Sequence, residues 1–108
     1  MIQLTVLYGQ PQDPVAFDRH YQQAHAALVY KIPGLKGFVY NKPSSLNPQE
    51  PSPYYVIANL YFENMPAIQA ALQSSEGQAV AGDLQNFATG GATLLVGEIQ
   101  GNQTITFG

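Results

Sequence analysis

The sequence predicts an α+β domain in which two helices cover one face of a single antiparallel sheet, with the element order βαββαβ. Strand-like segments fall at residues 2–8, 35–40, 54–62 and 92–99, and helical patterns separate the first two segments and the last two. The economical arrangement of this order is the split βαβ, or ferredoxin-like, motif. With 108 residues, the chain fits one domain spanning residues 1–108.

The first half of the motif is a strand followed by a long helix. Residues 2–8 alternate apolar and polar side chains, which is typical of a half-buried strand. The Asp13-Pro14 pair then starts a helix, because an Asp side chain accepts from free backbone N–H groups and Pro loses no hydrogen bond at the first helical position. We expect this helix to run from Pro14 to about Ile32, where the Pro-Gly pair at 33–34 ends it.

The second half begins with a strand at 35–40 and a loop at 42–53 that carries three prolines. The segment YYVIANLYF at 54–62 is apolar on both alternating faces, as in a strand covered on both sides. Asn64 or a neighbouring residue is placed to cap a short helix at 65–72.

The capping-box spacing of residues 75–78 starts another helical segment that reaches Phe87. A Gly-Gly turn at 90–91 precedes the last long strand, at 92–99. Residues 103–107 add a short strand.

The composition predicts that the chain associates with a second copy of itself. Only 10% of the residues are charged, whereas the chain contains seven Tyr and five Phe. Helices on one sheet face leave the other face of strand 54–62 uncovered. At about 25 cal/mol per Å², a few hundred Å² of exposed apolar sheet forfeits several kcal/mol. A homodimer formed sheet to sheet removes this cost.

Several classes of partner and chemistry are disfavoured. The net charge is −3 and no Lys/Arg cluster is present, so nucleic acid is not an expected partner. The absence of cysteine excludes disulfides, thiolate metal sites and cysteine nucleophiles. No run approaches the ~18 apolar residues of a membrane span, and the first residues lack the pattern of a signal peptide. We therefore expect a soluble cytoplasmic protein.

The stretch FDRHYQQAH at 17–25 holds both histidines of the chain. On an α-helical wheel, the stripe that packs on the sheet consists of Phe17, Tyr21, Ala24 and Leu28. His20 and His25 are five positions apart, about 140° around a straight helix, so they lie at opposite edges of this stripe and are not expected to bind one metal ion. Asp18 and Arg19 are predicted to be solvated charges on the helix surface.

Tyr21 and His25 form the candidate catalytic pair. They are four residues apart, so they are neighbours on one side of the helix. A neutral imidazole accepts a proton near neutral pH, and a phenol one turn away donates to a substrate oxygen or to the ring. The alternative is structural: His25 donates to a backbone carbonyl and Tyr21 fills space, which is the commoner role of a lone histidine near a core.

Four further residues are candidates for ligand binding. Asn59 lies in an otherwise apolar strand, so its amide needs a partner, which is either a substrate or a bulge or helix end. Tyr8, Tyr40 and Tyr61 either line a pocket with their hydroxyls or serve in aromatic packing. Asp83 resembles a helix cap or a helix-to-loop contact.

Three segments together, FDRHYQQAHAAL, KIPGLKGFVYN and GQAVAGDLQNFATGG, resemble the EthD family of the dimeric α/β-barrel superfamily, and the likeness runs from about Val6 to Glu98. The resemblance implies a ferredoxin-like fold whose sheets pair face to face in a barrel. The family pattern HYxxxHxxL matches His20, Tyr21, His25 and Leu28, and it implies that the second histidine borders the cleft between helix and sheet. The family often has Pro where this chain has Ala27.

The name-giving member of that family belongs to a bacterial system that degrades ethyl tert-butyl ether, beside a cytochrome P450 monooxygenase. Related proteins resemble cofactor-free oxygenases, decarboxylases or cyclases of polyketide-type aromatics. For this chain, the resemblance implies a small, mostly apolar ligand between sheet and helices. Neither the resemblance nor the residues indicate a metal or a redox cofactor.

Three hypotheses for function follow. In the first, the protein is an EthD-like dimer in a degradative or oxidative pathway that binds a small apolar or aromatic compound, with His25 as acid/base group and Tyr21 orienting it. In the second, it is a non-catalytic binding or accessory protein that supports a partner oxygenase. In the third, it is a closed self-assembling module with no ligand, which a pocket under about 100 Å³ would favour because ligand sites usually occupy several hundred Å³.

Overall fold

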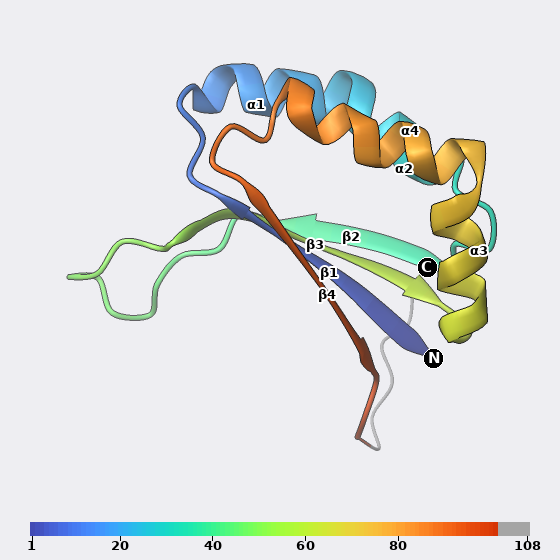
Figure 1. Ribbon diagram of the computed structural model, residues 1–108. Helices are drawn as coiled ribbons and strands as arrows, with labels where there is room; N and C mark the ends of the chain where they lie inside the picture. Colours follow the sequence, from blue (N-terminus) through green and yellow to red (C-terminus); the bar gives the residue numbers. More distant parts are fainter. Residues whose placement is uncertain (102–108) are drawn as a thin grey trace.

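The computed structural model describes residues 1–101 and confirms the expected fold class: a four-stranded antiparallel sheet with the helices on one face (Figure 1). The strand order is β2-β3-β1-β4. The strands are β1 (Ile2–Gly9), β2 (Gly37–Asn41), β3 (Tyr54–Phe62) and β4 (Ala92–Glu98). The strand expected at 103–107 lies outside the described residues.

The first helical segment has three parts: α1 (Pro14–His20), a π-helical turn η1 (Tyr21–His25) and α2 (Ala26–Tyr30). It begins as expected, with the Asp13 carboxylate accepting from the Ala16 N–H at 3.2 Å. Within η1, the N–H of Ala26 donates to the carbonyl of Tyr21, five residues earlier. Such a turn holds one more residue than an α-helical turn.

This extra residue changes the buried face of the segment. Phe17 and Tyr21 are buried as expected, but Ala24 and Leu28 are only half-buried, so the predicted stripe was wrong in its second half. The buried positions after the π turn are His25, Ala26 and Val29. Because the prediction assumed a straight α-helix, it missed the shift of one position that the π turn introduces.

The second helical segment consists of α3 (Met65–Gln73), α4 (Ser75–Asp83) and a 3-10 turn η2 (Leu84–Asn86). Asn64 caps α3 as predicted, accepting from the Ala67 N–H at 2.9 Å. The cap of α4 is Ser74, one residue before the expected position; its hydroxyl accepts from the Gly77 N–H at 3.0 Å.

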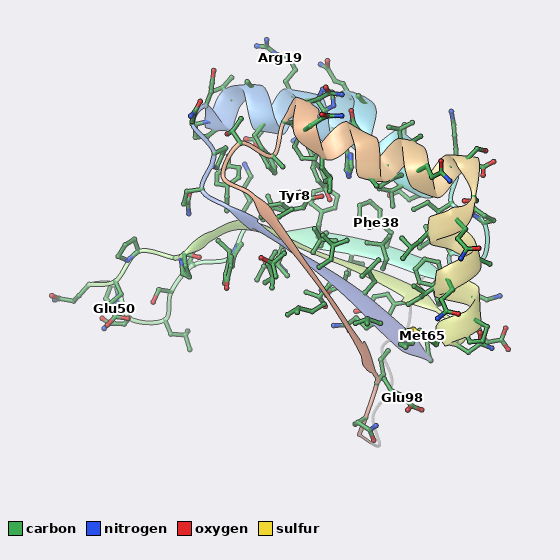
Figure 2. The ribbon with its side chains drawn as sticks, in the orientation of Figure 1. Tyr8, Arg19, Phe38, Glu50, Met65 and Glu98 are labelled. Carbon is green, nitrogen blue, oxygen red and sulfur yellow. The ribbon has the colours of Figure 1, made fainter. Side chains whose placement is uncertain are left out.

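The core lies between the sheet and the helices, where Figure 2 shows Tyr8 and Phe38 rising from the strands while Arg19 points away from the sheet. The ring of Tyr8 lies 5.5 Å from Phe17 and 5.6 Å from Phe87 between centroids. These contacts join β1 to both helical segments. Offset or edge-to-face aromatic pairs stabilise a core beyond the area that they bury.

At the start of β3, the side chains do not alternate regularly between the two faces of the sheet. The register of β1 with β3 slips between Tyr8 and Gly9, and Tyr55 packs edge-on against Phe17 at 5.1 Å instead of sharing a face with Ile57. Its hydroxyl donates to Asp18 at 2.9 Å, and Lys42 Nζ donates to the same carboxylate at 2.7 Å. Asp18, which was predicted to be a solvated charge on the helix surface, is partly exposed and pairs with both groups.

No helix within residues 1–101 packs on the opposite face of the sheet (Figure 1). The strand register places Leu7 between Ile57 and Thr93 on that face, and Thr5 between Asn59 and Leu95. Leu95 is 55% exposed. The face is thus a mixture of apolar and hydroxyl or amide side chains, less uniformly apolar than the sequence suggested.

Gly77 lies where α4 packs closely against the backbone of α3, so a substitution there tests this packing. A Cβ at this position would lie 2.0 Å from the carbonyl oxygen of Ala71, whereas a Cβ at Gly82, in the same helix, meets nothing within 4 Å. We expect Gly77→Ala to lower the free energy of unfolding by about 1–3 kcal/mol through overpacking. The control Gly82→Ala should leave it unchanged or raise it by up to about 1 kcal/mol. Urea denaturation measures both, and equal stability of the two variants would contradict the packing described.

Candidate functional site

The candidate site is centred on the imidazole of His25, whose side chain is 2% exposed. Its Nδ1 lies 2.8 Å from Oδ2 of Asp83, and its Nε2 lies 3.4 Å from the hydroxyl of Tyr8. An ionised carboxylate only accepts hydrogen bonds, so Nδ1 carries the proton in the neutral ring. The lone pair of Nε2 is then left facing Tyr8, as a proton acceptor requires.

Asp83 holds the site together from the end of α4. Its two oxygens lie 2.8 and 2.9 Å from Nε2 of His20, and the amide of Asn86 donates to Oδ1 at 2.9 Å. Burial by itself would raise the pKa of the Asp83 carboxyl, but the hydrogen bonds from Asn86, His25 and His20 outweigh it, so that the pKa lies below its usual value. Asp83 is therefore the anion that both imidazoles share.

Burial lowers the pKa of His25, whereas by itself it would raise the pKa of its partner Asp83. Removal from water lowers the pKa of the imidazole, and this effect exceeds the increase that the Asp83 hydrogen bond and charge produce. The ring is therefore neutral at pH 7 and able to accept a proton.

Sequence reasoning missed the role of Asp83. The Asn86 contact is the local helix-to-turn bond that was expected, but the bonds to His20 and His25 cross 63 and 58 positions of the chain. No local spacing signals such a contact. The only available signal was an acidic residue at the inner end of a helix that packs beside the histidine helix.

The expectation that His20 and His25 lie on opposite edges of the helix was also wrong. Residues five apart fall on one side of a π turn, and both rings converge on Asp83. Within residues 1–101, no group of three or more His, Cys, Asp or Glu side chains is arranged to hold a metal ion.

Tyr21 lies beside His25, with ring centroids 5.2 Å apart, as the four-residue spacing predicted. Its hydroxyl is buried and makes no hydrogen bond of ordinary length and angle within the described part of the chain, but it lies close enough to the Tyr8 hydroxyl for each group to affect the pKa of the other. Burial raises the pKa of this hydroxyl far above its usual value, and the nearby Tyr8 adds to the effect. Tyr21 is thus a neutral phenol whose donor has only a weak interaction with Tyr8, which is costly unless a ligand also uses it.

Tyr8, Tyr21 and His25 line a cavity of about 50 Å³ between the sheet and the helices. The rest of its wall is apolar and includes Leu4, Val6, Val29, Ile32, Phe38 and Leu60. This volume is below the limit of about 100 Å³ that separates a closed module from a ligand site, so by volume alone the cavity favours the closed module. One or two water-sized molecules fit in it, because a water occupies about 30 Å³ in the liquid.

The remaining predicted residues divide between the two sheet faces. Tyr40, 42% exposed, packs its ring on Tyr21 with centroids 4.8 Å apart, at the edge of the site. Asn59 lies on the opposite face, where its side-chain oxygen accepts from the Thr5 hydroxyl at 2.8 Å. Tyr61 is buried and lies two residues after Asn59 in β3, on the same face. The structure therefore brings Tyr40 against Tyr21, the neighbour of His25, and places Asn59 and Tyr61 on the other face of the sheet.

Comparison with known proteins identifies the family. The EthD domain profile matches residues 9–91, which is most of the chain. A protein of Rhodococcus erythropolis, described as an uncharacterised protein from the thcB-thcC intergenic region, is 45% identical over 88% of this chain and 91% of its own length. The chain belongs to the EthD family. The solved structure of an EthD family protein from Bacillus halodurans agrees, with 36% identity, a TM-score of 0.86 and coverage of 93% of this chain and 99% of that one.

More distant solved structures share only the fold of this EthD protein. A cofactor-independent oxygenase from Streptomyces nogalater, crystallised as a mutant, is 14% identical, with a TM-score of 0.66 and coverage of 96% of this chain and 95% of its own. A dimeric ferredoxin-like protein of unknown function from Jannaschia is 19% identical, with a TM-score of 0.66 and coverage of 92% and 100%. No helix in residues 1–101 is both long and apolar enough to cross a membrane.

The lowered pKa of His25 predicts a loss of stability in acid. An unfolded chain protonates this imidazole below about pH 6.5, whereas the folded chain does so only at a lower pH, so stability falls as the pH drops through that window. The lowered pKa of Asp83 adds a further loss at more acid pH, as the folded carboxyl is protonated. In His25→Gln, we expect the decline between about pH 6.5 and 5 to be shallower, measured by urea denaturation at each pH. Parallel declines in both proteins would contradict the burial of a neutral ring.

Proposed function

We propose that this EthD protein moves a proton to or from a small apolar or aromatic compound held between helices and sheet, with His25 as the acid/base group. One observation carries the proposal: Nδ1 of His25 is bound to a buried carboxylate at 2.8 Å, and the same ring lines an apolar cavity, where the acceptor Nε2 faces the hydroxyl of Tyr8. In hydrolases with a Ser-His-Asp triad, a carboxylate fixes the tautomer of the base in the same way and stabilises the imidazolium that forms.

In this proposal, orientation of His25 is the task of Asp83, and Tyr21 has a different role from the one expected. Both nitrogens of His25 face other groups, Asp83 and Tyr8. The hydroxyl of Tyr21 remains available to donate to a ligand oxygen at the cavity wall. Tyr8 also lines the cavity, and its hydroxyl lies 3.4 Å from Nε2 of His25. It passes a proton or a hydrogen bond from the ligand to that nitrogen.

A ligand of aromatic size requires the cavity to widen. A cavity of about 150 Å³ is known to bind benzene, roughly three times the volume present here. Two wall residues, Leu72 and Leu94, are 46% and 48% exposed, so their side chains can move into solvent. We infer that the compound enters the cavity where these two leucines form part of its wall.

Family membership supports a degradative or oxidative setting, such as ether degradation, for this reaction. The shared fold of a cofactor-independent oxygenase supports a variant in which proton abstraction prepares an aromatic compound for oxidation or cyclisation. Fold likeness by itself does not transfer an activity, so the proposal depends on the His25 geometry.

A second candidate is favoured by the small cavity: a closed or accessory module that binds no substrate, in which His25 and Asp83 pin the helices together. In that case, the ring of Tyr21 only fills space in the core.

Tyr21→Phe distinguishes the two candidates. The substitution removes a buried hydroxyl that has only a weak interaction with Tyr8, so we expect the free energy of unfolding to rise by up to about 1 kcal/mol. If the hydroxyl serves a ligand, the same variant binds oxygen-bearing aromatic compounds more weakly, as measured by thermal shift against a panel of small phenols and ketones. The matched control Tyr30→Phe, at a residue 67% exposed, should change neither property. Higher stability in Tyr21→Phe, with no compound of the panel bound by the wild type, would favour the module.

His25→Gln tests the acid/base role. For a hit that carries an acidic C–H bond, the protein should speed uptake of deuterium from heavy water, followed by NMR. We expect the variant to lose about 10²- to 10⁴-fold of this rate while it still binds the hit. Exchange at the wild-type rate in the variant would sink the proposal.

We further propose that two copies pair through the open sheet face, as the description of the Jannaschia protein as dimeric supports. Leu95, which lies on that face and is 55% exposed, is the test position. We expect light scattering to give the mass of a dimer, and Leu95→Lys to shift it toward the monomer because it places a charge in the contact. Val15→Lys, at an exposed residue of α1, should leave the mass unchanged. A wild-type monomer at all concentrations would refute this pairing.

A further inference from the structure

His20 lies at the outer end of a line of polar groups that leads from the surface to the buried cavity. Its side chain is 30% exposed, that of Asp83 is 9% exposed, and that of His25 is 2% exposed. The contacts along this line are short: 2.8 Å from His20 to Asp83 and 2.8 Å from Asp83 to His25. The line ends with Tyr8, 3.4 Å beyond His25.

His20 is not needed to orient the ring of His25. One acceptor fixes the Nδ1–H of His25, and Asn86 already donates to the Asp83 carboxylate. His20 adds a second ionisable ring on the same carboxylate, and it also lines a surface groove with Arg19, Gln23 and Asn86. A buried base that accepts a proton in each cycle has to return it to water, and the ring of His25 has almost no contact with solvent.

We propose that His20, acting through Asp83, is the solvent-side end of a proton relay that sets the protonation state of His25. This inference rests on the acid/base function proposed above. When Nε2 of His25 has accepted a proton, the Nδ1 proton passes to the Asp83 carboxylate. His20 is 30% exposed and exchanges with water between the tautomer whose Nε2–H donates to Asp83 at rest and the tautomer protonated on Nδ1; in the second tautomer, the proton moves from Asp83 to Nε2 of His20. His20 then releases a proton from its other ring nitrogen to water. When His25 later gives up its Nε2 proton, the same groups return one to Nδ1, so the cycle balances.

The groups that face the relay are few within the described chain. His20 faces Asp83 from α4, and it has Arg19 beside it on α1 and the ring of Phe87 stacked at 5.2 Å. His25 faces Asp83, Tyr8 of β1 and Tyr21 of η1. His20 is thus a positioning and relay residue, which touches neither the cavity nor its ligand.

The experiment measures how fast the Nδ1 proton of His25 exchanges with water, by NMR saturation transfer across pH on the full chain without ligand. His20→Phe keeps a ring against Phe87 but has no nitrogen, and His20→Gln keeps a donor for Asp83 but cannot pass a proton on. We expect exchange to slow about tenfold or more in both variants. Added imidazole should restore the rate in His20→Ala, where it can occupy the vacated space.

Backbone amide exchange of α1 and α4 is the control for local opening, and it should stay as in the wild type. Unchanged His25 exchange in His20→Phe and His20→Gln, with unchanged amide protection, would overturn the relay, as would failure of imidazole to restore His20→Ala. Slow His25 exchange caused only by altered amide protection would also count against it. Because no ligand is needed, the relay can hold while the deuterium-uptake assay fails, or fail while that assay succeeds.

Discussion

The buried carboxylate of Asp83 is the constraint on which the rest of the site depends. An anion taken out of water is costly unless hydrogen-bond donors replace the water, and Asp83 receives donors from His20, His25 and Asn86. These donors come from both helical segments. The carboxylate therefore joins the two helical segments to each other, and the same contacts fix the ring of His25.

The π turn Tyr21–His25 makes that arrangement possible. On a regular α-helix, His20 and His25 point in different directions, whereas one extra residue in the turn aims both at a single carboxylate. A π turn is less favourable than an α-helical turn, and the weakly bonded, buried hydroxyl of Tyr21 adds a second local cost in the same five residues. Natural proteins tolerate such costs mainly at functional sites, which is why we place the function of the chain here.

The rest of the fold serves as a frame for this segment. The β1 strand supplies Tyr8 beneath His25, and the aromatic contacts of Phe17 and Phe87 hold both helical segments over the sheet. The fold is shared with proteins less than 20% identical to this chain, including an oxygenase and a protein of unknown function. A fold that is shared this widely does not determine a function, so the functional argument rests on the polar groups that this chain carries on the frame.

Local chemistry in the sequence determined the elements. The caps Asp13 and Asn64 and the apolar strand Tyr54–Phe62 depend only on neighbouring residues, so they were predictable, as was the Tyr21–His25 contact across one turn. The partner of His25 was not, because Asp83 approaches it only when the two helical segments pack together. The π turn and the turn of Tyr55 toward α1 were also decided by packing, since a helical wheel and a strand alternation both assume regular geometry that tertiary contacts can override.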